Sequence, residues 1–419
     1  MAITRTVLGP AVDAHRLLTR LQRLAKIGAD EAGGVTRPGF TAADLAGRDY
    51  VAAEAAAAGL SASVDAAGNL VVSRSADLAK GGPVVLMGSH LDTVVQGGPL
   101  DGAYGVIAGL EVLQALAETG AEMRHEPVLV AFANEEGARF PCPFWGSLAL
   151  TGRLARTPYD IRDQAGVSLD EALREVGGDP DRLESAAWPP GSVAAYLELH
   201  IEQGPVLERL GLTIGVVEAI VGRTVVEIEL RGRAGHAGTT PMDARADALT
   251  FAARVVLMVE EVAATRRLCA VATAGRLRVA PGVTNVVPGL VRLTAEFRDA
   301  APERLRAAEE TLMTQLAELA HGAPIQVETT VSDRFAPVAT DASLRAAIGR
   351  AAGELGLATH ALPSGAGHDA QIVATLAPMG MIFVPSRDGV SHVPEESTAD
   401  ADLVAGAQVL LRTVQRVGR

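Results

Sequence analysis

Residues 84–111 read VVLMGSHLDTVVQGGPLDGAYGVIAGLE, in which an apolar run precedes a glycine-rich stretch and a second apolar run at helical spacing. We expect a strand at Val84–Met87, a loop, and a helix at Ala103–Glu118. The next apolar run, Val128–Ala133, fits another strand. Strands that alternate with helices in this way are typical of a parallel α/β sheet.

The same alternation extends to both sides of this stretch. The further elements that we expect are a helix at Ala42–Gly59, a strand-like segment at Ala62–Ser73, a short helix around Leu169–Val176, a strand at Tyr196–Ile201, a helix at Ala342–Leu355, a strand at Gly380–Pro385 and a closing helix at Ala399–Val417. We therefore predict an α/β domain with an open, mostly parallel sheet and helices on both faces, built from residues 1–213 and 333–419.

Residues 214–332 follow a different order, β-α-β-β-α-β. The expected elements are Thr224–Leu230, Ala246–Thr265, Ala270–Val279, Val291–Arg298, Pro302–Ala320 and Ile325–Val331. This order is typical of a ferredoxin-like α+β unit. We therefore expect a small domain inserted into the sheet domain.

Composition limits the classes of function. The chain has 419 residues, 48% of them hydrophobic and 21% charged, which fits a folded protein of about two domains. Its net charge is −13 and its basic residues are scattered, so we expect no nucleic-acid partner. The N-terminal residues lack the apolar core of a signal peptide, and no stretch of about 18 apolar residues follows. We therefore expect a cytoplasmic protein without a membrane partner, in which Cys142 and Cys269 are reduced.

Residues capable of acid-base chemistry fall at the ends of the predicted strands. They are His90, the pair Glu135 and Glu136 in ANEEGARF, His200 in LELHIEQG, and His392 in SRDGVSHVPEE. In open α/β sheets ligands bind beyond the carboxyl ends of the strands, so we expect these side chains to converge. Histidines and carboxylates without thiolates suit zinc, manganese, cobalt or nickel. Five ligands are too many for one catalytic ion, but they fit two ions if a carboxylate bridges them.

The opening stretch offers that carboxylate. Asp101 could bridge two ions, and Asp92 is placed to hydrogen-bond the far nitrogen of a ligating His90. Of the adjacent pair Glu135 and Glu136, one can ligate while the other accepts the proton of the attacking water. Taken alone, the stretch equally fits an ordinary strand-loop-helix junction, in which the aspartates bond the local backbone.

Other polar residues could bind substrate. His236 lies in RGRAGHAGTTPMDAR, Asn285 in GVTNVVPG and Arg298 in AEFRD. An amide and a guanidinium together can hold a carboxylate, although Arg298 could instead pair with Asp299 or Glu296. The glycine-rich loop SGAGHDAQ, residues 364–371, adds Gly365 and His368 as candidates, and a simple turn is the alternative there.

Seven motifs together resemble a known family. They are GSHLDTVVQGGPLDGAYGVIAGLE, ANEEGARF, ELHIEQGPVLE, GRAGHAGTTPM, TNVVPG, SGAGHDAQ and SRDGVSHVPEE, with GGVTRPGFTAAD as an eighth segment. In them the chain resembles the hydantoinase/carbamoylase family of dinuclear metal-dependent amidohydrolases, in the aminoacylase–metallopeptidase clan. Members include N-carbamoyl-L-amino-acid hydrolases, β-ureidopropionases and allantoate amidohydrolases. The resemblance implies a zinc-peptidase-like sheet domain and an inserted domain that acts as lid and dimerisation surface.

The resemblance also implies roles for particular residues. His90, Asp101 and His200 would hold one divalent ion, and Asp101, Glu136 and His392 would hold the other. Glu135 would be the general base and acid, and His236, often supplied by the partner subunit of a homodimer, would stabilise the oxyanion. Gln203, Asn285 and Arg298 would bind the substrate carboxylate, with Gly365 and His368 also in the substrate site.

Two positions depart from the family pattern. Glu296 stands where these enzymes usually carry the aspartate of D-x-R, and PCPFWGSLALTG has Trp145 and Leu148 where many relatives have an arginine after GS. The second difference falls in a segment that we expect to line the pocket, so it affects specificity.

The predicted activity is hydrolysis of the ureido C–N bond of an N-carbamoyl-L-amino acid or related small ureido acid, by a metal-activated water. It would release an amino acid, carbon dioxide and ammonia. Allantoate amidohydrolase and β-ureidopropionase are the nearest alternatives, and an aminoacylase or dipeptidase is the next. A binding protein that only uses metal for stability is a further alternative from another class.

Overall fold

The computed structural model describes residues 9–75, 82–154 and 161–419. Residues 1–8, part of the segment in which we expect no signal peptide, lie outside this description. The chain forms two compact units, one of Met1–Glu218 with Thr340–Arg419 and one of Ala219–Ala339. No helix among the described residues is both long enough and apolar enough to cross a membrane.

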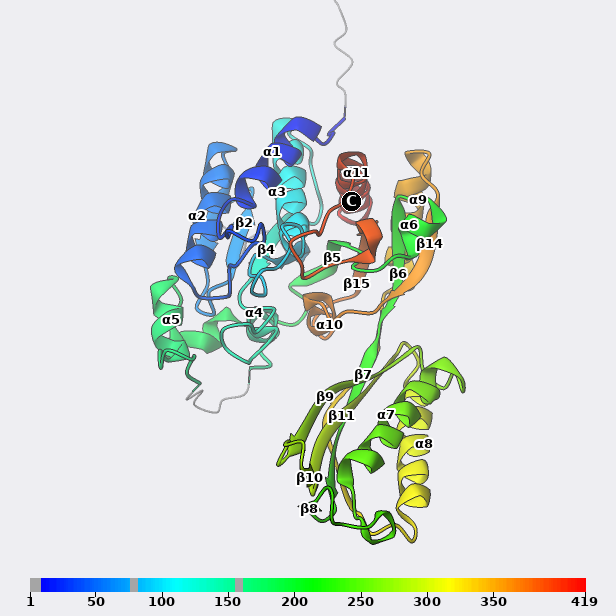
Figure 1. Ribbon diagram of the computed structural model, residues 1–419. Coiled ribbons are helices and arrows are strands. Elements are labelled where there is room, and N and C mark those ends of the chain that lie inside the picture. The colour runs from blue at the N-terminus through cyan, green and yellow to red at the C-terminus, as the bar shows by residue number, and fades with distance from the viewer. Residues whose placement is uncertain (1–8, 76–81, 155–160) are drawn as a thin grey trace, which may run out of the picture. The chain divides into compact units, whose positions relative to one another are not determined.

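The first unit is built on a nine-stranded sheet (Figure 1). In spatial order its strands are β1 (Ser61–Val64), β2 (Leu70–Ser73), β4 (Pro127–Phe132), β3 (Val84–His90), β5 (Val193–Ile201), β15 (Met379–Val384), β6 (Ile214–Ile220) and β13 (Val338–Ala339), with β14 (Thr359–Ser364) also beside β6. The four central strands β4, β3, β5 and β15 are parallel. Every residue of β3, β4 and β15 is buried, which explains why these strands read as continuous apolar runs.

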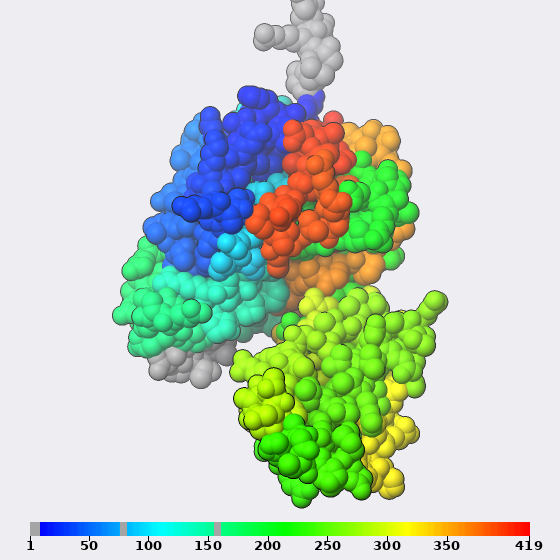
Figure 2. All heavy atoms as spheres, viewed as in Figure 1, coloured from blue at the N-terminus to red at the C-terminus, as the bar shows by residue number. Residues whose placement is uncertain are grey.

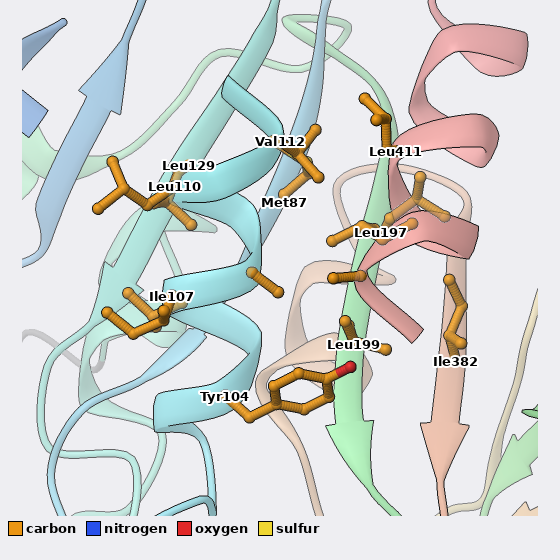
Figure 3. Close-up of a cluster of buried hydrophobic side chains, with 14 of the residues drawn as sticks. Met87, Tyr104, Ile107, Leu110, Val112, Leu129, Leu197, Leu199, Ile382 and Leu411 are labelled. Carbon is orange, nitrogen blue, oxygen red and sulfur yellow. The ribbon is translucent and has the colours of Figure 1, made fainter. Parts of the chain in front are cut away.

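Helices cover both faces of this sheet. The helices of the unit are α1 (Ala14–Leu24), α2 (Ala42–Ala57), α3 (Ala103–Glu118), α4 (Trp145–Leu150), α5 (Leu169–Glu175), α6 (Val206–Leu210), α9 (Ala342–Glu354), α10 (Asp369–Val373) and α11 (Asp400–Val417), with 3₁₀ turns at Pro180–Ala186 and Arg387–Gly389. Leu197 and Leu199 of β5 pack with side chains of α3 and α11 (Figure 3). The intervening Glu198 faces the other way and accepts a hydrogen bond from Ala370 N of α10. The predicted open sheet with helices on both faces is therefore confirmed.

Close packing fixes α3 over the sheet. Gly105 of α3 lies so near β5 that a Cβ there would collide with the carbonyl oxygen of Leu199. The segment before α1 and the C-terminal helix α11 also contact each other, because Val12 N donates to Gln408 Oε1 at 3.0 Å. The C-terminal residues accordingly lie beside the N-terminal segment on the surface of this unit (Figure 2).

The second unit has a four-stranded antiparallel sheet, a separate two-stranded antiparallel pair and two helices. Its elements are β7 (Gly222–Arg231), β8 (Gly235–His236), a 3₁₀ turn at Met242–Ala244, α7 (Ala248–Ala264), β9 (Val271–Ala280), β10 (Val286–Val287), β11 (Leu290–Asp299), α8 (Pro302–Ala320) and β12 (Gln326–Phe335). The main sheet has the order β12-β7-β11-β9, and β8 pairs separately with β10. Order and connections are those of the predicted ferredoxin-like unit.

Two details differ from the sequence-based expectation. The segment Ala62–Ser73 is a hairpin of β1 and β2, because Asp65 accepts backbone hydrogen bonds from Ala67 and Asn69 and closes a tight turn. The inserted unit begins and ends later than 214 and 332. Most of β6 belongs to the first unit, where it pairs with β15, and β12 continues to Phe335.

Candidate metal centre

Three histidines lie around Asp101, at or beyond the carboxyl ends of the central strands. His90 is the last residue of β3 and His200 lies one residue before the end of β5. Their Nε2 atoms lie 3.9 and 3.0 Å from Asp101 Oδ1. The second carboxylate oxygen, Oδ2, lies 2.8 Å from His392 Nε2, which is 3.5 Å from Glu136 Oε1. The two oxygens of Asp101 thus face two separate sets of potential ligands.

The protonation of the histidines fits ligation. His90 Nδ1 lies 2.9 Å from the carbonyl oxygen of Asp92, and His200 Nδ1 lies 2.8 Å from that of Ile201. A carbonyl can only accept, so each Nδ1 carries a proton, which leaves Nε2, the nitrogen beside Asp101, as the one that would bind a metal ion. The backbone N–H of Gly102, which points at His200 Nε2 at 3.2 Å, agrees with this assignment. Neutral imidazoles and carboxylates are the donors that a borderline divalent cation requires.

Asp92 supports the centre in a different way from the one predicted. Its carboxylate Oδ1 is 3.9 Å from His90 Nδ1, beyond hydrogen-bond distance, and its backbone carbonyl contacts that nitrogen instead. The carboxylate accepts the backbone N–H groups of Glu135 and Glu136, both at 3.1 Å. Asp92 therefore orients His90 through its backbone and the glutamate loop through its side chain.

Burial and like charges shift the protonation of the acids. Burial raises the pKa of Glu135 well above its usual value, and burial also raises the pKa of Glu136 to about 7. Burial alone would lower the pKa of His90, but the carboxylates of Glu135, Asp92 and Asp101 raise it well above its usual value. The excess of carboxylates that attracts protons here also attracts metal cations.

The loops around the centre have strained backbone. Asn134, Gln203 and His392 have φ of 50, 58 and 61°, in the left-handed region that non-glycine residues rarely adopt. Such conformations concentrate at functional sites, where the surrounding structure holds them.

The predicted substrate residues of the first unit lie near Asp101 and His200. Gln203 Nε2 donates to Asp101 Oδ2 at 3.1 Å, while its Oε1 is buried without a hydrogen-bond partner among the described residues. The buried His368 ring lies 4.7 Å from that of His200, with Nε2 2.7 Å from Ser364 Oγ. Gly365 is exposed in the loop that follows β14.

The second unit brings only two of its three predicted residues together. His236 of β8 pairs with Val286 of β10, next to Asn285, whose carbonyl accepts the N–H of Ala237 at 3.0 Å. Arg298 lies near the far end of β11, eight residues or roughly 27 Å beyond Leu290. Its Nε donates to Glu296 Oε1 at 2.6 Å, the pairing that the sequence left open.

His236 has a defined tautomer. Its Nδ1 accepts the backbone N–H groups of Gly238 and Thr239 at 3.0 and 3.2 Å. Since Nδ1 must offer a lone pair to both, the proton of the neutral ring sits on Nε2. The exposed side chain therefore presents an N–H donor, as an oxyanion-stabilising group must.

Three further side chains change the sequence-based interpretation. Trp145 is 1% exposed and donates from Nε1 to Ala67 O at 3.0 Å, so this side chain belongs to the core, whereas Leu148, which follows Gly146-Ser147, is half-buried. Buried Glu198 accepts hydrogen bonds from Ser89 and Tyr196, and buried Glu396 lies against the Asp101 loop. Neither glutamate is among the predicted site residues. Glu198 could have been predicted to lie near the site, because it precedes His200 by two residues in a strand and so lies on the same face of the sheet.

Comparisons with known proteins identify the family of this chain. Residues 86–416 match peptidase family M20/M25/M40. An N-carbamoyl-L-amino acid amidohydrolase of Geobacillus stearothermophilus is 42% identical over 408 residues, covering 97% of this chain and 99% of that protein. An allantoate amidohydrolase of Bacillus subtilis is 35% identical over 395 residues, covering 93% and 94%. The crystal structure of a hydantoinase/carbamoylase family amidase from Burkholderia multivorans superposes with a TM-score of 0.88 at 37% identity, covering 98% of each chain.

The chain belongs to peptidase family M20/M25/M40, among relatives of the hydantoinase/carbamoylase type. It is a hydrolase acting on a C–N bond, and its family and candidate ligand groups indicate metal dependence.

Proposed function

We propose that this protein hydrolyses the ureido C–N bond of an N-carbamoyl-L-amino acid or a related ureido acid, releasing the amino acid, carbon dioxide and ammonia. The observation that carries the proposal is Asp101, whose two oxygens face His90 and His200 on one side and His392 with Glu136 on the other. The named activities of the relatives support this substrate class. An allantoate amidohydrolase is the second candidate, because a relative with that name matches 93% of the chain.

We infer a site for two divalent ions, drawn from Zn²⁺, Mn²⁺, Co²⁺ or Ni²⁺. His90, Asp101 and His200 would hold one, and Asp101, Glu136 and His392 the other. Bound there, the ions would supply Lewis-acid polarisation of the carbamoyl oxygen and would lower the pKa of water.

Glu135 is the proposed proton carrier. Its carboxylate lies 3.8 Å from His90 Nε2 and is 9% exposed. Burial raises the pKa of Glu135 above its usual value, which makes its carboxylate a stronger proton acceptor. Glu135 would take a proton from the attacking water on a carboxylate oxygen and deliver it to the leaving nitrogen.

The proposed substrate-binding residues have different roles. His236 would donate from Nε2–H to the developing oxyanion, and Gln203, Asn285 and Arg298 would bind the carboxylate, near Gly365 and His368. Because Arg298 lies at the opposite end of its unit from His236 and Asn285, one copy of this unit cannot bring all three to one small ligand. This separation supports a homodimer in which one subunit supplies Arg298 and the other supplies His236 and Asn285.

A substrate panel tests the proposal. Protein loaded with Mn²⁺, Co²⁺ or Zn²⁺ is incubated with N-carbamoyl-L-amino acids, N-carbamoyl-β-alanine, allantoate and N-acetyl-L-amino acids. We expect ammonia from the N-carbamoyl-L-amino acids at a rate well above amino-acid release from the N-acetyl compounds. Preferred turnover of allantoate would favour the second candidate. Turnover of only the N-acetyl compounds would show that the enzyme is an aminoacylase.

A further inference from the structure

Glu396 is a buried carboxylate that contacts the loop carrying Asp101. It is 3% exposed, and its Oε1 accepts the backbone N–H groups of Leu100 and Asp101 at 2.8 and 3.0 Å. Almost 300 residues separate the partners in sequence. The backbone on both sides of the Leu100–Asp101 peptide is thus fixed by one side chain.

The other oxygen of Glu396 holds the loop that carries His392. Ser391 Oγ donates to Glu396 Oε2 at 2.6 Å and also lies 3.3 Å from Asp101 Oδ2. His392, the next residue, has the strained φ of 61°. Glu396 therefore links the segment before one proposed ligand to the backbone of another.

The chain makes room for this carboxylate. A Cβ at Gly98 would collide with the Glu396 side chain, so only glycine permits the approach. By contrast, the neighbouring Glu395 carries the same charge but is exposed. The two adjacent acids differ in environment, which makes Glu395 a matched control.

We propose that Glu396 is a positioning residue for the metal centre. It orients Asp101 so that one carboxylate oxygen faces each ligand set, and it holds the His392 loop against the second oxygen. This inference rests on the proposed two-ion site. Groups that orient metal ligands commonly change metal affinity by about 10- to 100-fold when they are replaced.

Equilibrium dialysis against Co²⁺, followed by metal analysis of the protein, tests the proposal without any substrate. We expect Glu396→Ala to weaken binding of at least one ion about 10- to 100-fold, whereas Glu395→Ala binds Co²⁺ like the wild type. Glu396→Gln retains an oxygen that accepts the two N–H groups, so it should recover much of the lost affinity. The visible absorption spectrum of bound Co²⁺ should change in Glu396→Ala, because the ligand geometry around Asp101 changes.

Two controls separate a positioning role from a general loss of structure. Far-UV circular dichroism shows whether Glu396→Ala is folded. Ser391→Ala removes one of the three hydrogen bonds to Glu396, and the 3.3 Å contact with Asp101 Oδ2, but leaves both bonds to the Asp101 loop, so it should weaken Co²⁺ binding to a smaller extent. Wild-type affinity and spectrum in folded Glu396→Ala, or equal losses in Glu395→Ala, would overturn the inference. If the wild type binds Co²⁺ but hydrolyses no ureido acid, the proposed function fails while the role of Glu396 is still decided by the binding data.

Discussion

The adjacent residues Glu135 and Glu136 have different environments, and this difference indicates that they have different functions. Glu135 and Glu136 follow β4, and Asp92 fixes both backbone N–H groups, so the two side chains diverge from a common anchor. Glu136 approaches His392, whereas Glu135 approaches His90. Of the two, Glu136 is the one that lies in a group with Asp101 and His392.

Substitution of the two glutamates should therefore have separable effects. We expect Glu135→Ala to keep its bound metal and to lose about 100- to 10,000-fold in kcat, because the proton carrier is gone. Glu136→Ala should lose metal as well as activity. Metal analysis together with ammonia release measures both quantities. Unchanged turnover of Glu135→Ala would show that another residue carries the proton.

At the scale of elements, the position of α3 depends on the absence of a side chain at Gly105. Replacing an exposed helical glycine by alanine usually stabilises a protein by about 1 kcal/mol. We expect Gly105→Ala to be destabilising instead, because its Cβ would collide with the Leu199 carbonyl oxygen. Gly349→Ala in α9, where a Cβ meets nothing within 4 Å, should be stabilising. Urea unfolding of both variants tests the prediction, and equal signs would contradict it.

The start of α9 gives a pH-dependent contribution to stability. Asp341 accepts backbone hydrogen bonds from Ser343 and Leu344 at 2.8 and 3.1 Å, and the Ser343 hydroxyl lowers its pKa below the usual value. The cap is therefore fully formed above the unfolded pKa of about 3.9 and is lost as pH falls through the lower folded pKa. We expect Asp341→Ala to cost about 1 kcal/mol at pH 7. Its deficit in the free energy of unfolding should shrink in acid, and a deficit independent of pH would contradict the assignment.

The main elements could be predicted because local pattern and final environment agree. Val84–Met87 and Val128–Ala133 are apolar throughout and become fully buried parallel strands. The hairpin at Ala62–Ser73 is harder to predict, because its turn depends on hydrogen bonds to Asp65 and on the positive φ of Gly68. The predicted bound at residue 214 groups β6 with the inserted domain, whereas in the structure β6 pairs with β15, a pairing that nothing in the local sequence indicates.

In the site, too, local sequence pattern predicts some features and long-range contacts determine the others. Four of the proposed ligands, His90, Glu136, His200 and His392, could be identified because each lies at or after the carboxyl end of a strand, where the sheet itself makes side chains converge. The roles of Glu396 and of the Asp92 carboxylate depend on backbone N–H groups of remote loops. Hydrogen bonds of that kind leave no periodic signal in the sequence.

At the scale of the whole molecule, the predicted homodimer makes a test by complementation possible. His236→Ala and Arg298→Ala are each expected to be nearly inactive. A heterodimer of the two, isolated through different affinity tags, contains one intact site if the residues of a site come from different subunits. It should then show about half of the wild-type rate per dimer. A heterodimer as inactive as the parents would show that both residues act within one chain.

The central claim, that two ions at Asp101 support hydrolysis of a ureido bond, is tested most directly by titrating metal-depleted protein with Mn²⁺. Bound metal and ammonia release from an N-carbamoyl-L-amino acid are measured in the same samples. We expect activity to rise with bound metal until about two ions are held per subunit, and Asp101→Ala to remain inactive throughout. Full ammonia release by the depleted protein, or by Asp101→Ala, would contradict the claim.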